Sequence, residues 1–151
     1  MSTALQHFRR AHLVPAFDRA SVADVMRPGV ISCPADTPLA QVAEMMATYR
    51  VHAIVVAGTR LDAVRGEQLV WGFLSDADLV HAARSGGVEG LTAGAVAHTQ
   101  APTVEPSTWL PTAARIMDEH GVAHLVVASG GQPVGVMSTL DVAAALAWGG
   151  A

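Results

Sequence analysis

The chain contains an internal repeat, and this repeat restricts its possible folds more than any other feature. Ser21–Met26 is similar to Thr92–Ala97, and Val51–Val56 is similar to Val122–Val127; in both pairs the second copy lies 71 positions further along. After these segments the separation falls to 63, so the first copy holds eight additional residues within the loop expected at 57–69. Self-similarity over most of a chain predicts two copies of one structural unit.

Both copies predict the same series of elements. A short helix capped by Ser21 or Thr92 leads to an extended segment, a helix, two strands and a final helix, which is the order β-α-β-β-α after the first helix. Thr37 and Thr108 are expected to cap the second helix, since Thr followed by Pro38 is a typical helix start. The residues at helical spacing that should face the core are Leu39, Val42, Met45, Met46 and Tyr49 in one copy, and Leu110, Ala113, Ile116 and Met117 in the other.

The repeat also predicts the domain boundaries. We expect an N-terminal leader at 1–20, repeats at 21–85 and 92–147, a glycine-rich linker at 86–91 and a tail at 148–151. Within the leader, residues 7–14 could form a short amphipathic helix.

A Ser-x-x-Asp motif recurs at corresponding points of the two copies, as Ser75 to Asp78 and Ser138 to Asp141. Each motif follows a short apolar run and precedes a helical pattern, which predicts a strand, a sharp turn and a helix start. One interpretation is a capping box, in which Ser and Asp satisfy the first helical N–H groups. The other is a pair of ligand-binding turns, because N–H groups at such a turn point outward.

The repeated series resembles the cystathionine-β-synthase (CBS) domain, and two such domains in tandem resemble a CBS pair, or Bateman module. The resemblance covers residues 21–147 and rests on the capped helix, Asp-Thr-Pro-Leu, Val-His-Ala-Ile-Val-Val and Gly-Phe-Leu-Ser-Asp-Ala-Asp, with their counterparts in the second copy. It implies a mixed α/β fold of two pseudo-symmetric β-α-β-β-α halves packed through their sheets. It further implies clefts between the halves for AMP, ADP, ATP or S-adenosylmethionine as regulatory ligands, with no required cofactor, and association into a homodimer.

The resemblance also implies which residues meet the ligand. Asp78 and Asp141 would accept hydrogen bonds from ribose hydroxyls, while Ser75, Ser138 and the helix N-termini would meet a phosphate. Segments 30–34 and 101–104 would line the base pocket, and the candidates there are Ile31, Ser32, Thr103 and Val104, although ordinary strand burial is the favoured explanation for each of them. Thr37 and Thr108 are helix caps first, and a ligand contact through the same hydroxyl is the second interpretation.

Phosphate binding also requires positive charge. His52 and His124 lie near the start of the second strand, where they could contact phosphate or act as packing residues; Arg27, Arg50 and Arg115 are further candidates. Asp76 precedes the first motif's Asp, where the second copy has Thr139, so the first turn carries more negative charge. We therefore expect the turn of Ser138 and Asp141 to be the better nucleotide site.

The composition argues against several other classes. The formal charge is −4 and the nine arginines are scattered, so we do not expect nucleic acid as a partner. No apolar run approaches the roughly 20 residues of a membrane span, and we expect a cytoplasmic protein without a membrane partner. One cysteine excludes an internal disulfide, and His120 and His124 are placed at a helix end and a strand, which does not predict a metal site. No nucleophile with a base is evident, so an enzyme is not expected.

The resulting hypothesis is a non-catalytic regulatory module that senses an adenosine-containing ligand. The ligand would stabilise one arrangement of a dimer that an unidentified regulated protein recognises. The alternative is a structural or protein-interaction module with empty or degenerate clefts, which acts through its apolar surfaces; Trp71, Trp109 and Trp148 could serve such an interface or simply pack.

Overall fold

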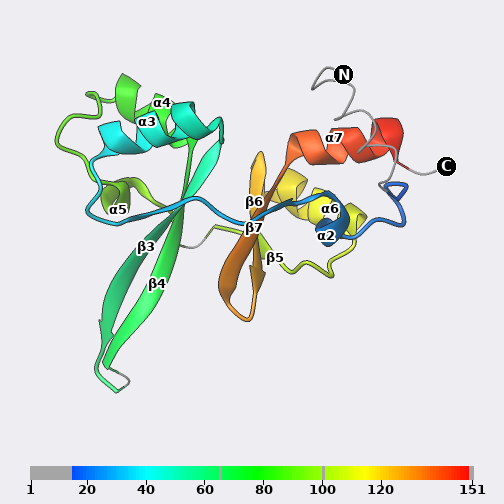
Figure 1. The fold of residues 1–151 in the computed structure, drawn as a ribbon, viewed down its shortest axis with the longest axis horizontal. Coiled ribbons are helices and arrows are strands. Elements are labelled where there is room, and N and C mark those ends of the chain that lie inside the picture. Colours follow the sequence, from blue (N-terminus) through cyan, green and yellow to red (C-terminus); the bar gives the residue numbers. More distant parts are fainter. Residues whose placement is uncertain (1–14, 65, 100, 150–151) are drawn as a thin grey trace. The chain divides into compact units, whose positions relative to one another are not determined.

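The chain forms two compact units that interleave along the sequence (Figure 1). The computed structural model describes residues 15–149 except 65 and 100, with the backbone alone at 59–62 and 66–69. Val30–Ala101 forms one unit, here called the inner unit; residues 15–29 and 102–149 form the other, here called the flanking unit. The helix expected at 7–14 lies outside the described residues.

The inner unit is a three-stranded sheet with three helices. Its strands lie in the order β2-β3-β4, with β2 parallel to β3 and β3 antiparallel to β4. His98 adds an isolated antiparallel bridge to Phe73 at the free edge of β4. The elements are β2 (Ser32–Pro34), α3 (Leu39–Tyr49), β3 (Ala53–Asp62), β4 (Gly66–Ser75), α4 (Asp76–Arg84) and α5 (Ala93–Val96).

The flanking unit repeats this plan with a four-stranded sheet. Its strands lie in the order β1-β7-β6-β5, with β5 parallel to β6 and the other pairs antiparallel. The elements are α2 (Val22–Val25), β1 (Arg27–Pro28), β5 (Thr103–Val104), α6 (Leu110–His120), β6 (His124–Ser129), β7 (Gln132–Ser138) and α7 (Thr139–Trp148). The expected mixed α/β class and the repeated order of elements are confirmed.

The short helices are exchanged between the two units. Helix α2 precedes the residues of the inner unit in the sequence but belongs to the flanking unit, and α5 precedes residues 102–149 of the flanking unit but belongs to the inner unit. In the flanking unit, Leu110 donates its backbone N–H to the Ala20 carbonyl at 2.9 Å, and Val22 donates to Thr108 at 2.8 Å. In the inner unit, Leu39 donates to Leu91 at 2.9 Å. These bonds attach α2 to the start of α6, and α5 to the start of α3.

The same bonds explain why the expected threonine caps are wrong. Helix α3 begins at Leu39 after Pro38, α6 begins at Leu110 after Trp109, and neither start has a side-chain cap. The first N–H group of each helix is satisfied by the carbonyl of the attached segment, so no hydroxyl is needed there. Thr108 instead accepts the Glu105 N–H at 3.2 Å. Thr37 is buried and hydrogen-bonds the Cys33 thiol.

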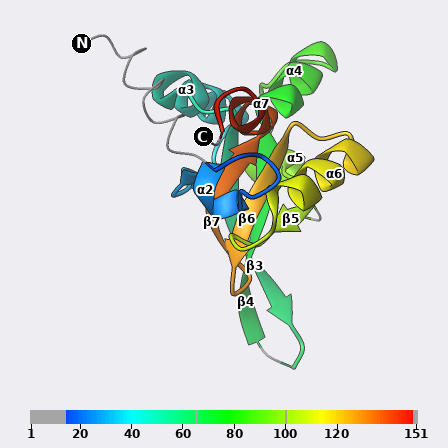
Figure 2. The same ribbon diagram turned by 90° about the vertical axis from the view of Figure 1, so that its right-hand side faces the viewer.

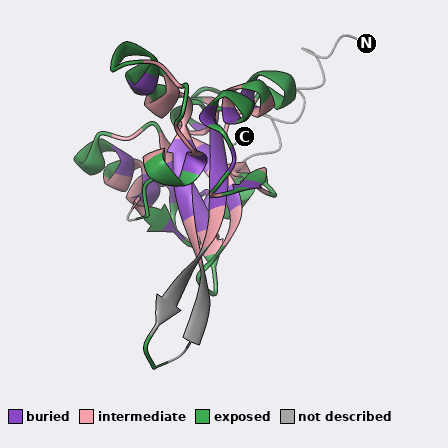
Figure 3. Cartoon of the chain, turned by 90° about the vertical axis from the view of Figure 1, so that its left-hand side faces the viewer, coloured by how far each residue is buried: buried purple, intermediate pink, exposed green. Residues whose placement is uncertain are grey.

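A separate apolar core fills each unit, formed by the inward sides of the strands and helices (Figure 3). In the inner unit Leu39, Val42 and Met46 of α3 pack against Ile54 and Leu74. In the flanking unit Leu110, Ala113 and Met117 of α6 pack against Leu125 and Met137. Burial of these side chains is the main favourable contribution to folding. Tyr49 was expected in the core but is 59% exposed, because it lies in the last turn of α3 beyond the strands.

The eight-residue insertion lengthens a hairpin instead of forming a loop. Strand β3 continues to Asp62 and pairs with β4 from Gly66, whereas β6 and β7 pair only as far as Ser129 and Gln132. The longer ribbon is the green hairpin that extends below the helices in Figures 1 and 2. The β-branched residues Ile54, Val55, Val56 and Thr59 favour a strand. The loop expected at 57–69 is therefore wrong in type.

Candidate ligand-binding site

Both Ser-x-x-Asp motifs form capping boxes at the junction of a strand and a helix. Asp78 accepts the Ser75 backbone N–H at 2.8 Å and the Ser75 hydroxyl at 3.2 Å, both through Oδ2. In the flanking unit Asp141 accepts from Ser138 with the same atoms and the same distances. The capping interpretation is therefore correct for both turns. It leaves the Oδ1 atom of each carboxylate for other partners.

The remaining candidates divide evenly between the two units. Ile31 is half-buried and Ser32 exposed in the inner unit; Thr103 is exposed and Val104 buried in the flanking unit. Val104 belongs to the core, so only its backbone could meet a ligand. Each unit thus holds one Ser-x-x-Asp turn and one extended segment that joins the edge of the same sheet.

The two candidate histidines occupy different environments. His52 is exposed, and its Nδ1 lies 2.8 Å from Oδ2 of Asp76. The negative charge that Asp76 adds to the first turn therefore has a basic partner. His124 is half-buried at the start of β6, directly opposite Ser138 in the antiparallel register.

A third histidine, which sequence reasoning missed, lies at the first turn. His98 Nε2 is 2.8 Å from Oδ1 of Asp78, and both residues belong to the inner unit. Its repeat counterpart is Arg27, because Arg27 pairs with Val136 in β7 as His98 pairs with Phe73 in β4. A signal was present: His98 follows Arg27 by the repeat separation of 71 positions, so both copies carry a basic residue here.

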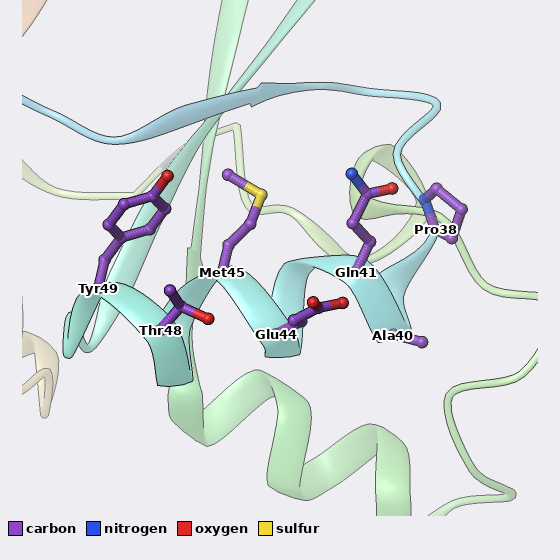
Figure 4. A pocket seen from close by; sticks show the side chains of 7 residues that line it. All are labelled: Pro38, Ala40, Gln41, Glu44, Met45, Thr48 and Tyr49. Atoms are coloured by element: carbon purple, nitrogen blue, oxygen red, sulfur yellow. The ribbon is translucent and has the colours of Figure 1, made fainter.

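One surface hollow lies away from the Ser-x-x-Asp turns, and a second adjoins the turn of Ser138 and Asp141 through Thr139. The larger, about 520 Å³, follows the outer side of α3 in the inner unit, where Gln41, Met45 and Tyr49 project from one side of the helix (Figure 4). The second, about 300 Å³, lies between the end of α6 and the start of α7 in the flanking unit. None of the candidate ligand-binding residues lines either hollow.

Over residues 15–149 without 65 and 100, no group of three or more His, Cys, Asp or Glu side chains could hold a metal ion. In the same part of the chain, no helix has the length and apolar character needed to cross a bilayer.

Comparison with known proteins identifies the repeat. The CBS domain model matches residues 22–85 and 93–147. The fold is similar to that of an uncharacterized conserved protein from Pyrococcus horikoshii, with a TM-score of 0.71 and 20% identity over 83% of this chain and 91% of that one. A search of curated proteins gives no match.

Two further structures of similar fold contain adenosine compounds. The CBS domain pair of protein MJ0100, in complex with 5′-methylthioadenosine and S-adenosyl-L-methionine, has a TM-score of 0.67 and 14% identity, over 82% of this chain and 97% of that one. CBSX2 in complex with AMP has a TM-score of 0.65 and 23% identity, over 82% and 93% of the two chains.

Proposed function

The chain belongs to the CBS domain family, and from this premise we propose that it is a regulatory module that binds an adenosine-containing ligand at its Ser-x-x-Asp turns. AMP, ADP, ATP and S-adenosylmethionine are the candidate ligands. Binding would favour one conformation over another and so change how a regulated protein recognises the module. No chemical step is assigned to the chain.

The observation that carries this proposal is the arrangement of the Asp141 carboxylate. An ionised carboxylate offers about four acceptor positions, and the capping box of α7 uses two of them, both on Oδ2. The positions on Oδ1 suit two neighbouring hydroxyl donors, such as those of a ribose. Helix α7 also presents its N-terminal dipole at the same turn, which favours an anionic group nearby. The complexes of MJ0100 and CBSX2 support adenosine compounds as the ligand class.

A thermal-shift screen tests the proposal. The full chain would be heated with AMP, ADP, ATP, S-adenosylmethionine or cyclic dinucleotides. A ligand that binds the native state stabilises it by RT ln(1 + [L]/Kd), or about 2.7 kcal/mol at a hundredfold excess over Kd. A rise in melting temperature with an adenosine compound supports the proposal. The same melting temperature with all of them favours the alternative, a protein-interaction module with empty clefts.

We also infer that the chain associates with itself, as expected for a homodimer. The observation in favour is that both units expose large apolar side chains, and burying them against a second copy of the chain would remove apolar surface from water. Sedimentation velocity would give a mass of about twice 15.6 kDa for a dimer. The exposed side chains include Tyr49 (59%), Val80 (69%), Trp109 (60%), Leu140 (74%), Leu146 (64%) and Trp148 (44%).

A further inference from the structure

The carboxylate of Asp78 is engaged through both of its oxygen atoms. Oδ2 accepts the Ser75 N–H and hydroxyl, and Oδ1 lies 2.8 Å from His98 Nε2. An ionised carboxylate can only accept hydrogen bonds, so Nε2 carries the proton and donates. Of the four acceptor positions, three are therefore used within the inner unit. The Asp78 side chain is 20% exposed and the His98 side chain 59% exposed, so the contact lies at the surface of the inner unit.

The backbone fixes His98 at this place. Phe73 donates its N–H to the His98 carbonyl at 2.9 Å, and His98 donates its N–H to the Phe73 carbonyl at 2.8 Å. Phe73 precedes Ser75 by two positions in β4, so the two residues are on the same side of the strand. His98 is thus held beside the turn that begins α4, within reach of Asp78.

The flanking unit has the same backbone arrangement with different side chains. Arg27 pairs with Val136, which precedes Ser138 by two positions in β7. Arg27 is exposed, and within the described part of the chain it forms no ion pair, while no side chain donates to Oδ1 of Asp141. Asp141 therefore keeps two acceptor positions. The guanidinium of Arg27 is at the register position that His98 occupies in the inner unit.

We propose that His98 lowers the ligand affinity of the Asp78 turn below that of the Asp141 turn, because it occupies the Asp78 oxygen that a ribose would need. The ligand then binds first at Asp141. Two adjacent ribose hydroxyls find two free acceptor positions at Asp141 and only one at Asp78. Arg27 supplies positive charge to an anionic group of the ligand at Asp141. At Asp78 the neighbouring charged groups already form the pairs His98 with Asp78 and His52 with Asp76. The inference rests on the proposed function. It explains the difference in ligand affinity between the two turns by the contact of His98 with Asp78, and no longer by the additional negative charge of Asp76.

Calorimetric titration with AMP tests the inference. We expect Asp141→Ala to weaken the tighter site at least about tenfold, the effect of one hydrogen bond to a charged group, and Asp78→Ala to leave that site unchanged. Adding His98→Ala to Asp141→Ala isolates the inner turn and should strengthen its AMP binding by about tenfold. Adding His81→Ala to Asp141→Ala is the matched control, because His81 is an exposed histidine of α4, and in the described part of the chain no hydrogen bond or ion pair joins its side chain to Asp78.

The outcomes separate the inference from the proposed function. If the wild-type protein binds neither AMP nor S-adenosylmethionine, the proposed function fails and the inference fails with it. If the wild-type protein binds AMP but removal of His98 gives no gain over the His81 control, only the inference is overturned. Should His98→Ala fail to fold by circular dichroism, His98→Val takes its place, since it keeps the backbone pairing with Phe73 and lacks a donor.

Discussion

Leu110 donates its backbone N–H to the carbonyl of Ala20 at 2.9 Å, which joins two residues far apart in the sequence. The bond begins α6 and also attaches α2 to the flanking unit. The core of that unit confirms the attachment, because Ala20 and Val22 are fully buried beside Leu110 and Met137. Residues 15–29 are therefore structural parts of a unit whose other residues begin at Pro102.

This arrangement predicts the effect of shortening Val22. Val22→Ala removes two methyl groups from the core of the flanking unit, and we expect a loss of about 1 to 3 kcal/mol in the free energy of unfolding. Urea denaturation followed by circular dichroism measures it. Val80→Ala is the control: Val80 is 69% exposed in α4, so its truncation should change stability by less than about 0.5 kcal/mol. Equal effects of the two substitutions would contradict the burial of α2.

Two equivalent glycines offer a second comparison. A Cβ at Gly135 would lie 2.7 Å from the Arg27 carbonyl oxygen, a backbone atom that cannot move without disturbing β1. At the corresponding Gly72 the nearest atom is the Ala97 Cβ at 3.1 Å. We expect Gly135→Ala to lower the free energy of unfolding by about 1 to 3 kcal/mol and Gly72→Ala by less. Thermal melts of the two variants measure the difference, and a greater loss at Gly72 would show that β1 is not held against β7 as described.

The single cysteine predicts a dependence of stability on pH. Burial raises the pKa of the Cys33 thiol, and its hydrogen bond with Thr37 offsets part of this increase. The folded state thus holds the thiol proton more tightly than the unfolded state. The resulting stabilisation is complete below the ordinary thiol pKa of about 8.5 and is lost as pH rises through the higher pKa of the folded state.

Urea denaturation between pH 7.5 and 10 measures this loss. Cys33→Val is a suitable control, because Val104 occupies the equivalent buried position in the flanking unit. The valine variant should keep the fold and lose the part of the pH dependence that belongs to the thiol. The native thiol should also react slowly with a disulfide reagent at pH 8, since it is buried and protonated. Rapid reaction of the folded protein would contradict this environment.

The capping boxes predict that the substitution with the smaller effect on ligand binding, Asp78→Ala, has the larger effect on stability. Asp141→Ala removes a capping box and should lower the free energy of unfolding by about 0.5 to 2 kcal/mol. Asp78→Ala removes an equal box and also the contact with His98, an ion pair worth at most about 1 kcal/mol. Without ligand, we therefore expect Asp78→Ala to melt at the lower temperature. The reverse order would show that the His98 contact does not stabilise the inner unit.

The features that could be predicted from the sequence are those that depend on the spacing of neighbouring residues. The repeat, the order of elements and both capping boxes follow from residues only a few positions apart, and Thr92 caps α5 through the Ala95 N–H as expected. The caps at Thr37 and Thr108 were wrong, because the decisive acceptors, Leu91 and Ala20, come from distant segments. The contact between His98 and Asp78 escaped prediction for the same reason. The repeat separation indicates a basic residue at both positions 27 and 98, but it does not indicate the bridge beside β4 that brings His98 to Asp78.

The interleaving of the two units also gives the molecule an order of assembly during synthesis. The inner unit is complete once the ribosome has added Ala101, whereas α2 and β1, made earlier, have no sheet to join until β7 emerges. Folding of the inner unit first would replace a long flexible loop with a compact body and so reduce the entropic cost of closing β1 onto β7. Residues 102–149, which are made last, would then complete the fold by pairing with α2 and β1, which are made first.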